Sequence, residues 1–204
     1  GNALISTASS PKLDVTSTGA TVTNTVQADD ASGYLGTSTN HPLSLRTNNA
    51  ARVTISSAGA VTMPSTPAFS EGLSTEQTNV AINTWVTVLF DTEVFDQGSN
   101  FNTGTYTFTA PVTGKYQLNA TLRLNTVDDA ATFYQFRIIT SNRSYMMTFD
   151  PRHYSGDPSY LSFSWSALAD MDASDTASVS VYQSGGTAQT DIDTESQFNG
   201  FLAC

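Results

Sequence analysis

The stretch GTYTFTAPVTGKYQLNATLRL, residues 104–124, decides the fold class of this chain. Threonines alternate with aromatic residues up to Phe108, and polar residues alternate with apolar ones from Tyr116 onwards. A period of two is typical of β-strands that bury one face. Pro111 and Gly114 interrupt the alternation and have the chemistry of a turn. The stretch therefore predicts two half-buried strands folded around a corner.

The same period recurs along the chain from Phe69 onwards. The alternating segments are WVTVLF (85–90), TFYQFRII (132–139), SYLSFSWSAL (159–168), TASVSVYQ (176–183) and the closing SQFNGFLAC (196–204). Turn residues separate these segments. About seven to ten strands in a region of this size indicate an all-β sandwich or jelly roll.

Composition supports a folded β protein and excludes several other classes. Ser and Thr together exceed a quarter of the 204 residues, and Thr favours the half-solvated surface of a sheet. Eleven Phe, eight Tyr and two Trp can supply a core, which argues against a disordered Ser/Thr-rich chain. Cys204 is the only cysteine, so an intrachain disulfide and a cysteine-based zinc site are excluded. No apolar run approaches the roughly 18 residues of a membrane span, so we expect no membrane insertion.

The net charge of −10 is unevenly distributed. Residues 1–68 carry three acids and three bases, whereas residues 69–204 carry fifteen acids and five bases. A surface that binds phosphates needs clustered Lys and Arg side chains, and the sequence has no such cluster. We therefore expect no nucleic-acid partner.

Residues 1–66 contain two copies of a short template. LDVTSTGATV (13–22) and VTISSAGAV (53–61) both have alternating apolar residues, then small polar residues, Gly and an apolar residue. LSLRTNNAA (43–51) is a degenerate copy with Asn49 in place of Gly, because Asn tolerates the left-handed conformation. Such units expose their apolar side chains unless neighbouring chains cover them, which predicts a β-rich segment that associates with other chains. An irregular linker is the alternative.

A second domain, residues 67–204, follows a boundary marked by Pro64 and Pro67. Its informative segments are PAFSEGL (67–73), VLFDTEVFDQGSNFNTGTYTFTAPVTGKY (88–116), ASDTASVSVYQSGG (173–186) and ESQFNGFLAC (195–204). Together they resemble the globular C1q (complement) head of the complement and tumour-necrosis-factor superfamily. The resemblance implies a ten-stranded jelly roll that assembles as a homotrimer.

The resemblance also implies roles for particular residues of the head. The implied core residues are Phe90, Tyr106, Phe108, Tyr116, Phe198 and Phe201, and the alternation of SYLSFSWSAL adds Phe163 and Trp165. Gly104 and Gly114 match turn positions. On this interpretation, the Gly-x-Tyr-x-Phe segment before the corner serves the core of the head rather than a binding site.

The N-terminal template resembles the shaft repeats of trimeric viral fibres, in which three chains wind together. Residues 34–63 are similar to a stretch common in bacteriophage tail and fibre proteins. Most animal relatives of the head carry a collagen stalk, and this chain has no Gly-X-Y repeat. We therefore expect a homotrimeric fibre at the virion surface, joined to tail or capsid proteins through its N-terminal side.

The sequence contains no recognisable catalytic constellation. His41 and His153 are the only histidines, and no nucleophile elbow, His-Glu-x-x-His pair or phosphate-binding glycine loop is present. Asp128 and Asp129 could be taken for a glycosidase pair, but side chains of adjacent residues point apart. We expect that the protein is not an enzyme.

Calcium is the candidate cofactor, because hard cations bind several carboxylate and carbonyl oxygens on flexible loops. The candidate ligands are Asp128, Asp129, Asp170, Asp172 and Asp175, with Asp191 and Asp193 as a further pair. Some relatives in the resembled family bind calcium near the trimer axis. None of these spacings matches an EF-hand, and solvated acidic loops that keep a trimer soluble are the alternative.

Three loops between the expected strands are candidates for receptor binding, because loops vary freely while the alternating core holds the fold. They are NTVDDAA (125–131), FDPRHYSGDPSY (149–160) and QSGGTAQTD (183–191). The second loop contains Arg152, His153, Tyr154 and Tyr160, a mixture that suits stacking on sugars and hydrogen bonding. An ordinary connection stabilised by Pro and Gly is the alternative interpretation.

Three functions are compatible with these patterns. The first is a trimeric virion fibre whose C-terminal head binds a host-surface receptor or glycan. The second is a capsid-decoration fibre or trimerisation cap that has no receptor of its own. The third is a secreted lectin-like head, against which the absence of collagen and of a signal-peptide pattern argues.

Overall fold

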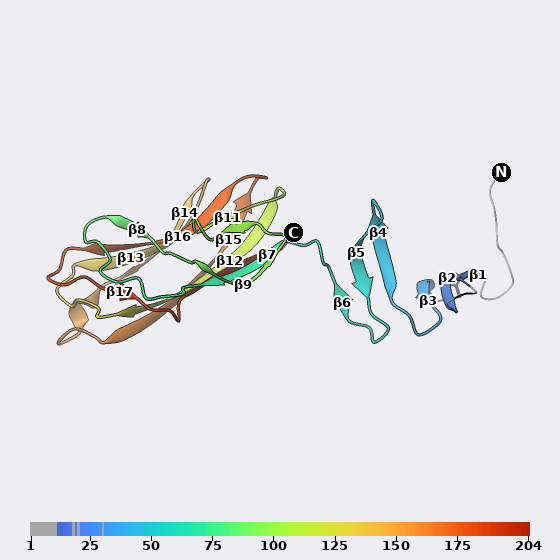
Figure 1. Cartoon of the computed structure of the whole chain (residues 1–204), viewed down its shortest axis with the longest axis horizontal. Helices are drawn as coiled ribbons and strands as arrows, with labels where there is room; N and C mark the ends of the chain where they lie inside the picture. Colours follow the sequence, from blue (N-terminus) through green and yellow to red (C-terminus); the bar gives the residue numbers. More distant parts are fainter. Residues whose placement is uncertain (1–11, 18, 20, 30) are drawn as a thin grey trace. The chain divides into compact units, whose positions relative to one another are not determined.

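The computed structural model describes residues 12–17, 19, 21–29 and 31–204. The chain divides into two compact units, Gly1–Ser65 and Thr66–Cys204 (Figure 1). Both units consist of β-strands, and one short 3-10 helix, η1 (Pro151–His153), occurs in the second. Within the described ranges, no helix is long and apolar enough to cross a membrane.

The N-terminal unit contains two separate three-stranded antiparallel sheets. Their strands are β1 (Lys12–Ser17), β2 (Val22–Ala28) and β3 (Gly33–Thr37), and β4 (Leu43–Thr47), β5 (Ala50–Ile55) and β6 (Val61–Thr62). Asn48 and Asn49 form the β4–β5 turn with left-handed φ angles of 48° and 59°, and Gly59 (φ 87°) lies in the β5–β6 turn. The template residues Asn49 and Gly59 are therefore turn residues, as the pattern predicts.

These sheets leave most of their apolar side chains in contact with solvent. The exposed residues are Leu13, Val15, Val26, Tyr34, Leu35, Leu45, Ile55 and Val61. Among the described residues of this unit, only Thr25 is buried, and none belongs to the hydrophobic core cluster. A three-stranded sheet without a covering layer has no core of its own.

The second unit, which we call the head, is a sandwich of two antiparallel sheets (Figure 1). The first, called here the β16 sheet, has the order β10-β11-β16-β13-β14, with β8 paired to β16. The second, the β12 sheet, has the order β15-β12-β18-β7-β9, with β17 paired to β12. The strands are β7 (Ala68–Gly72), β8 (Trp85–Thr87), β9 (Thr92–Gln97), β10 (Phe101–Asn102), β11 (Thr107–Thr109), β12 (Gly114–Asn125), β13 (Phe133–Thr140), β14 (Ser144–Phe149), β15 (Tyr160–Met171), β16 (Thr176–Ser184), β17 (Asp191–Ile192) and β18 (Gln197–Leu202).

Alternation along the strands places the core between the two sheets. On β12 the buried residues are Tyr116, Leu118, Ala120, Leu122 and Leu124, while their neighbours stay partly exposed. Aromatic rings from different strands then stack, with ring centroids 4.5 Å apart for Phe69 and Phe108 and 4.7 Å apart for Phe136 and Phe163. The all-β jelly-roll prediction is confirmed by this arrangement.

Most of the implied core residues lie in this core, but two do not. Phe90, Phe108, Tyr116 and Phe198 are fully buried, and Phe163 and Trp165 are partly buried and pack against the core. Phe201 is 47% exposed because it lies on the opposite face of β18 from Phe198. Tyr106 is only partly buried and has a left-handed φ of 59°, because residues 103–106 form a turn before β11 begins. The core prediction is therefore wrong for Phe201 and Tyr106.

The assignment of the two glycines also needs one correction. Gly104 lies in the turn before β11, as expected. Gly114, in contrast, is the first residue of β12, and a Cβ atom there would lie 2.7 Å from the carbonyl oxygen of Cys204. This glycine is needed for the close approach of the last residues, where the Lys115 N–H donates to that carbonyl at 2.7 Å.

Candidate functional site

The three loops singled out in the sequence meet at one end of the head. They connect β12 to β13, β14 to β15, and β16 to β17, and they lie at the far end of β12 from residue 204 (Figure 1). The Thr126 and Val127 N–H groups donate to carbonyls of residues 159 and 158, at 2.9 and 3.0 Å. The Thr132 N–H donates to the Ser184 carbonyl at 2.7 Å. We call this surface, residues 126–132, 150–159 and 185–190, the end loops.

Asp128 holds the end loops together. Its side chain is buried, and its Oδ2 accepts hydrogen bonds from the N–H groups of Thr187 (2.5 Å) and Ala188 (2.7 Å). Its Oδ1 accepts from the Ala130 N–H at 2.9 Å. The Asp128 N–H donates to the hydroxyl of Tyr134 at 3.0 Å, and burial raises the pKa of that hydroxyl to about 12. A carboxylate that accepts three N–H groups fixes loop conformation strongly.

Asp128 also belongs to a cluster of three carboxylates with Asp129 and Asp157. One oxygen of each lies within 4.8 Å of the others, and the Asp129 N–H donates to Asp157 Oδ1 at 2.8 Å. Burial, the hydrogen bond to Asp157 and the two neighbouring carboxylates raise the pKa of Asp129. Mutual repulsion of this kind is relieved by a proton or a cation, and calcium prefers such loop carboxylates. These three residues therefore form a site that could bind a metal ion.

The sequence paired Asp128 with Asp129 but did not include Asp157. Asp157 comes from the loop that was considered only for receptor binding. No spacing in the sequence indicates the contact, because it depends on the two loops folding against each other through residues 126–127 and 158–159.

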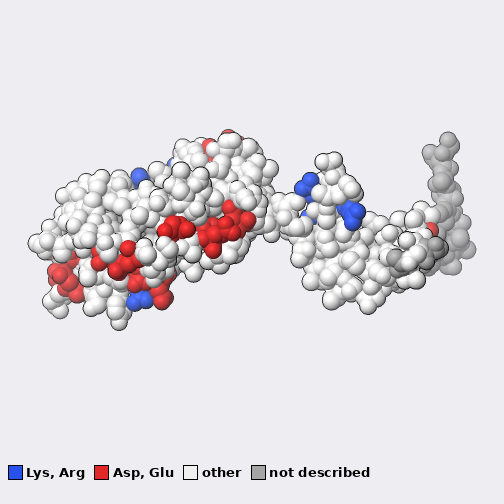
Figure 2. Space-filling view, viewed as in Figure 1, with Lys and Arg blue, Asp and Glu red and all other residues white. Residues whose placement is uncertain are grey.

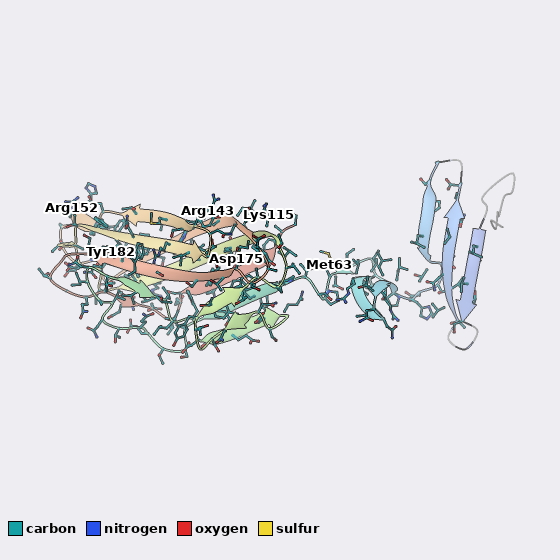
Figure 3. The ribbon with its side chains drawn as sticks, turned by 90° about the horizontal axis from the view of Figure 1, so that it is seen from above. Met63, Lys115, Arg143, Arg152, Asp175 and Tyr182 are labelled. Carbon is teal, nitrogen blue, oxygen red and sulfur yellow. The ribbon has the colours of Figure 1, made fainter. Side chains whose placement is uncertain are left out.

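The remaining predicted metal ligands are not part of this cluster, and the carboxylates of Asp170 and Asp175 have partners of their own. Asp170 accepts a hydrogen bond from Lys115 Nζ at 2.5 Å. Asp175 Oδ2 accepts from the Asp172 N–H at 2.8 Å and from Asn142 Nδ2 at 2.7 Å. Figure 3 shows Lys115 and Asp175 at one end of the head and Arg152 at the other. A single site that joins these aspartates to Asp128 is excluded by this separation.

Asp191 and Asp193, the further acidic pair, are also bonded within the protein. Asp191 Oδ1 accepts from the Asn79 N–H at 2.6 Å. Asp193 accepts from Asn125 Nδ2 at 2.7 Å and from the Glu195 N–H at 2.9 Å. Their carboxylates hold loops in place, and the clustered carboxylates of the described chain do not include them.

The four residues proposed for sugar stacking are not gathered in one place. Asp150 binds one edge of the Arg152 guanidinium, with Nε–Oδ1 and Nη2–Oδ2 distances of 2.9 and 2.6 Å. This arginine lowers the pKa of Asp150. The Tyr154 ring lies beside Phe149, at 6.2 Å between centroids, and His153 is exposed next to it.

Tyr160 has a different neighbour. It is the first residue of β15, and the guanidinium carbon of Arg123 lies 4.9 Å from its ring centroid. Arg123 in turn lies within 4.0 Å of Asp193 and 3.7 Å of Glu195. Tyr160 therefore belongs to a charged cluster on β12 and β17–β18 rather than to η1.

The fold and its end loops define a class before any comparison. A two-sheet sandwich of this kind is a scaffold that presents connected loops at one end. The family model described as "C1q domain" matches residues 68–203, and the chain therefore belongs to the C1q domain family. Domains of this family are typically non-enzymatic binding modules, and they usually form homotrimers.

Two solved structures illustrate the similarity. The globular domain of zebrafish complement 1qA protein has a TM-score of 0.50 at 17% identity, covering 68% of this chain and 98% of its own. Murine APRIL has a TM-score of 0.45 at 14% identity, covering 67% of this chain and 98% of its own. At these identities the likeness concerns the fold alone. No curated protein matches the sequence.

Proposed function

We propose that this chain is a virion fibre protein, of the bacteriophage tail or capsid type, whose head trimerises and binds a host-surface receptor or glycan. The N-terminal unit serves as the shaft and joins the head to tail or capsid proteins. The end loops provide the binding surface, the protein carries out no catalysis, and it acts at the virion surface, outside the cell.

The observation that carries the fibre proposal is that the described residues of the N-terminal unit form no hydrophobic core. Val15, Leu35 and Val61 are each about 60% exposed, at 62%, 63% and 60%. Apolar side chains in this number are normally covered, and in a shaft the cover comes from the other chains of the trimer. The strand-turn template of the sequence has the same requirement.

A second apolar surface supports trimerisation of the head. On the outward face of the β12 sheet, pairing places Leu168, Gln117, Phe201 and Ala68 in one row across four strands. Leu168 and Phe201 are 59% and 47% exposed, and Phe95 (49%) lies in the next row. Apolar and aromatic residues mixed with amides are typical of interface cores. We therefore assign this face to the contact between the three heads.

Competition for adsorption tests receptor binding directly. The full-length trimer should block attachment of the parent particle to its host cells, and Tyr154→Ala combined with Arg152→Ala should weaken the block. Arg143→Ala, at the opposite end of the head (Figure 3), is the matched control and should leave the block intact. Three weak sites in one trimer act together, so even weak single-site binding can anchor a particle.

The alternative function is a decoration fibre or trimerisation cap without a receptor. The Arg152 guanidinium favours it, because its Nε/Nη2 edge is already bonded to Asp150 and is not open to a ligand. If the trimer neither adsorbs to cells nor competes with particles, this alternative replaces receptor binding.

We further propose that the Asp128, Asp129 and Asp157 cluster binds calcium. The ion would connect the β12–β13 and β14–β15 loops, and it would thereby stiffen the end loops. The raised pKa of Asp129 and the convergence of three carboxylates support this proposal.

A further inference from the structure

Arg137 lies on the outward face of the β16 sheet, stacked on an aromatic ring. Its guanidinium carbon is 3.9 Å from the centroid of the Trp85 ring. The residues before and after it on β13, Phe136 and Ile138, are fully buried, so the Arg137 side chain points away from the core. Arg137 pairs with Ser180 on β16, and Trp85 pairs with Tyr182 on the same strand.

Two further rings extend this stack across the sheet. The Tyr182 ring lies 5.4 Å from that of Trp85, and the Phe133 ring lies 6.1 Å from Tyr182 in a stacked orientation. All three rings are partly exposed. We call the surface formed by Trp85, Phe133, Arg137 and Tyr182 the aromatic strip.

The guanidinium of Arg137 has neither an ion pair nor a hydrogen bond among the described residues. Its Nε is buried and has no partner, and burial lowers its pKa. Three other basic residues of the head, Lys115, Arg123 and Arg152, each have a carboxylate within 4.0 Å. The Nη groups of this guanidinium are not among the buried atoms without a partner, so they are the donors that a ligand can reach from solvent.

The charge of the head limits what that acceptor can be. On the face shown in Figure 2, acidic side chains gather in several clusters and basic ones are few. Because residues 69–204 carry fifteen acids and five bases, a polyanion such as a nucleic acid would be repelled. A compact ligand with one carboxylate avoids that repulsion and fits the two-pronged edge of a guanidinium.

We propose that the aromatic strip binds a carboxylated sugar. The carboxylate accepts hydrogen bonds from Arg137, and the apolar face of the sugar ring stacks on Tyr182 and Phe133. Gln135, which pairs with Tyr182 across the strands, lies on the same face and can bond the hydroxyl groups. The strip lies on the opposite side of the sandwich from Phe201 and Leu168, so it stays accessible when the β12 sheet is covered.

Titration of the full chain with small probes tests this site. Tryptophan fluorescence reports on Trp85, with Trp165 as the only other tryptophan. Sodium glucuronate should bind at least about tenfold more tightly than glucose or sodium acetate, because only glucuronate offers both the carboxylate and the ring. Equal binding of acetate and glucuronate would show a nonspecific anion effect and overturn the proposal.

Two arginine variants complete the test. Arg137→Met keeps the length of the side chain and should reduce glucuronate affinity about tenfold, because hydrogen bonds to a charged group are lost. Arg143→Met is the matched control, because Arg143 is exposed and the ring contacts of arginines among the described residues involve Arg123 and Arg137 instead. The glucuronate affinity of this variant should equal that of the parent. Unchanged affinity in Arg137→Met, with an unchanged melting temperature, refutes the site.

This site is separate from the end loops and does not depend on their proposed function. Probe binding is measured on the isolated chain, whereas host attachment is measured by adsorption of particles. If the chain binds glucuronate but does not adsorb to cells, the aromatic-strip proposal stands and the receptor proposal is refuted. If it adsorbs to cells but does not bind glucuronate, the receptor proposal stands and the aromatic-strip proposal is refuted.

Discussion

At the scale of single residues, Glu71 is the most unusual side chain of the head. It lies on β7 opposite Phe198, faces the interior and is fully buried. Neither carboxylate oxygen has a hydrogen-bond partner. Glu93 lies directly across the strand pair, and Asp96 is on the same strand as Glu93. Burial, followed by the charges of Glu93 and Asp96, raises the pKa of Glu71 to about 7.

This raised pKa makes the stability of the head depend on pH. Below pH 4.5, the ordinary value, Glu71 is protonated in both the folded and the unfolded chain. Between pH 4.5 and about 7 the unfolded chain releases the proton first, so the free energy of unfolding falls as the pH rises. The loss amounts to about 3 kcal/mol, because one pKa unit corresponds to about 1.4 kcal/mol.

Glu71→Gln should remove this contribution. In urea unfolding, the variant should gain stability relative to the parent as the pH is raised from 5 to 7.5. Glu195→Gln, an exposed acid, serves as the control and should follow the parent. An identical pH dependence in Glu71→Gln and the parent would contradict the assignment of Glu71.

A second residue-scale prediction compares two phenylalanines. Phe108 is fully buried and stacks on Phe69, whereas Phe201 is exposed. Phe108→Ala should therefore lower the free energy of unfolding by about 3–5 kcal/mol, the usual cost of truncating a buried aromatic residue. Phe201→Ala is the matched control, and its effect on unfolding at low protein concentration should be much smaller. Equal losses in the two variants would show that the exposed face also carries the fold.

At the scale of elements, the loop between β16 and β17 depends on Gly186. Its φ is 106°, and a Cβ atom there would collide with the Asp128 carboxylate. Gly186→Ala should therefore destabilise the head by about 1–3 kcal/mol, through backbone strain and through displacement of Asp128. Gly156→Ala in the neighbouring loop meets open space and should have little effect. Thermal melting of both variants makes the comparison, and similar melting temperatures would argue against Asp128 as the residue that holds the loops.

Calcium binding is tested on the same loops. Millimolar calcium should raise the melting temperature relative to chelator, because a ligand at a hundredfold excess over its dissociation constant adds about 2.7 kcal/mol. Asp157→Asn should abolish the increase, since Asp157 is the exposed member of the cluster and can be changed without opening the core. Asp172→Asn, at the other end of the head, should retain it. A melting curve that is the same with chelator and with calcium would eliminate the ion.

The sequence predicted strands better than it predicted the ends of strands. Unbroken alternation along residues 116–124 allows only one face of the strand to point into the core, and β12 buries that face. Tyr106 was misplaced because the turn at residues 103–106 depends on the fit to the β10–β11 hairpin. Phe201 could have been placed correctly, because residues 198 and 201 differ by an odd number and cannot share one face of a strand.

The candidate site was less predictable, because its parts come from separate loops. The loops themselves could be located as breaks between alternating segments. Asp157 joins Asp128 only through backbone hydrogen bonds between two loops, and such bonds have no sequence signature. Arg137 and Trp85 lie on strands that pair with different edges of β16, so their contact depends on the sheet order.

At the scale of the whole molecule, the exposed apolar side chains of both units predict a trimer. Light scattering of the full chain should give about three times 21.7 kDa. Phe201→Asp combined with Leu168→Asp should weaken the association, because charges are unfavourable at the centre of an interface. Met146→Asp, on the β16 sheet, is the control for an equally exposed apolar residue. A stable, well-folded monomer at micromolar concentration would refute both the shaft and the assigned interface.

The close bonding of residues 203 and 204 to Lys115 has a practical consequence. Cys204 is exposed, carries the only thiol of the chain, and lies at the end of β12 opposite the end loops. A maleimide dye or a thiol-reactive biosensor surface would therefore attach at one defined point. Heads immobilised in this way would all present residues 126–132, 150–159 and 185–190 to the solution, so a host extract passed over the chip would meet a uniformly oriented layer.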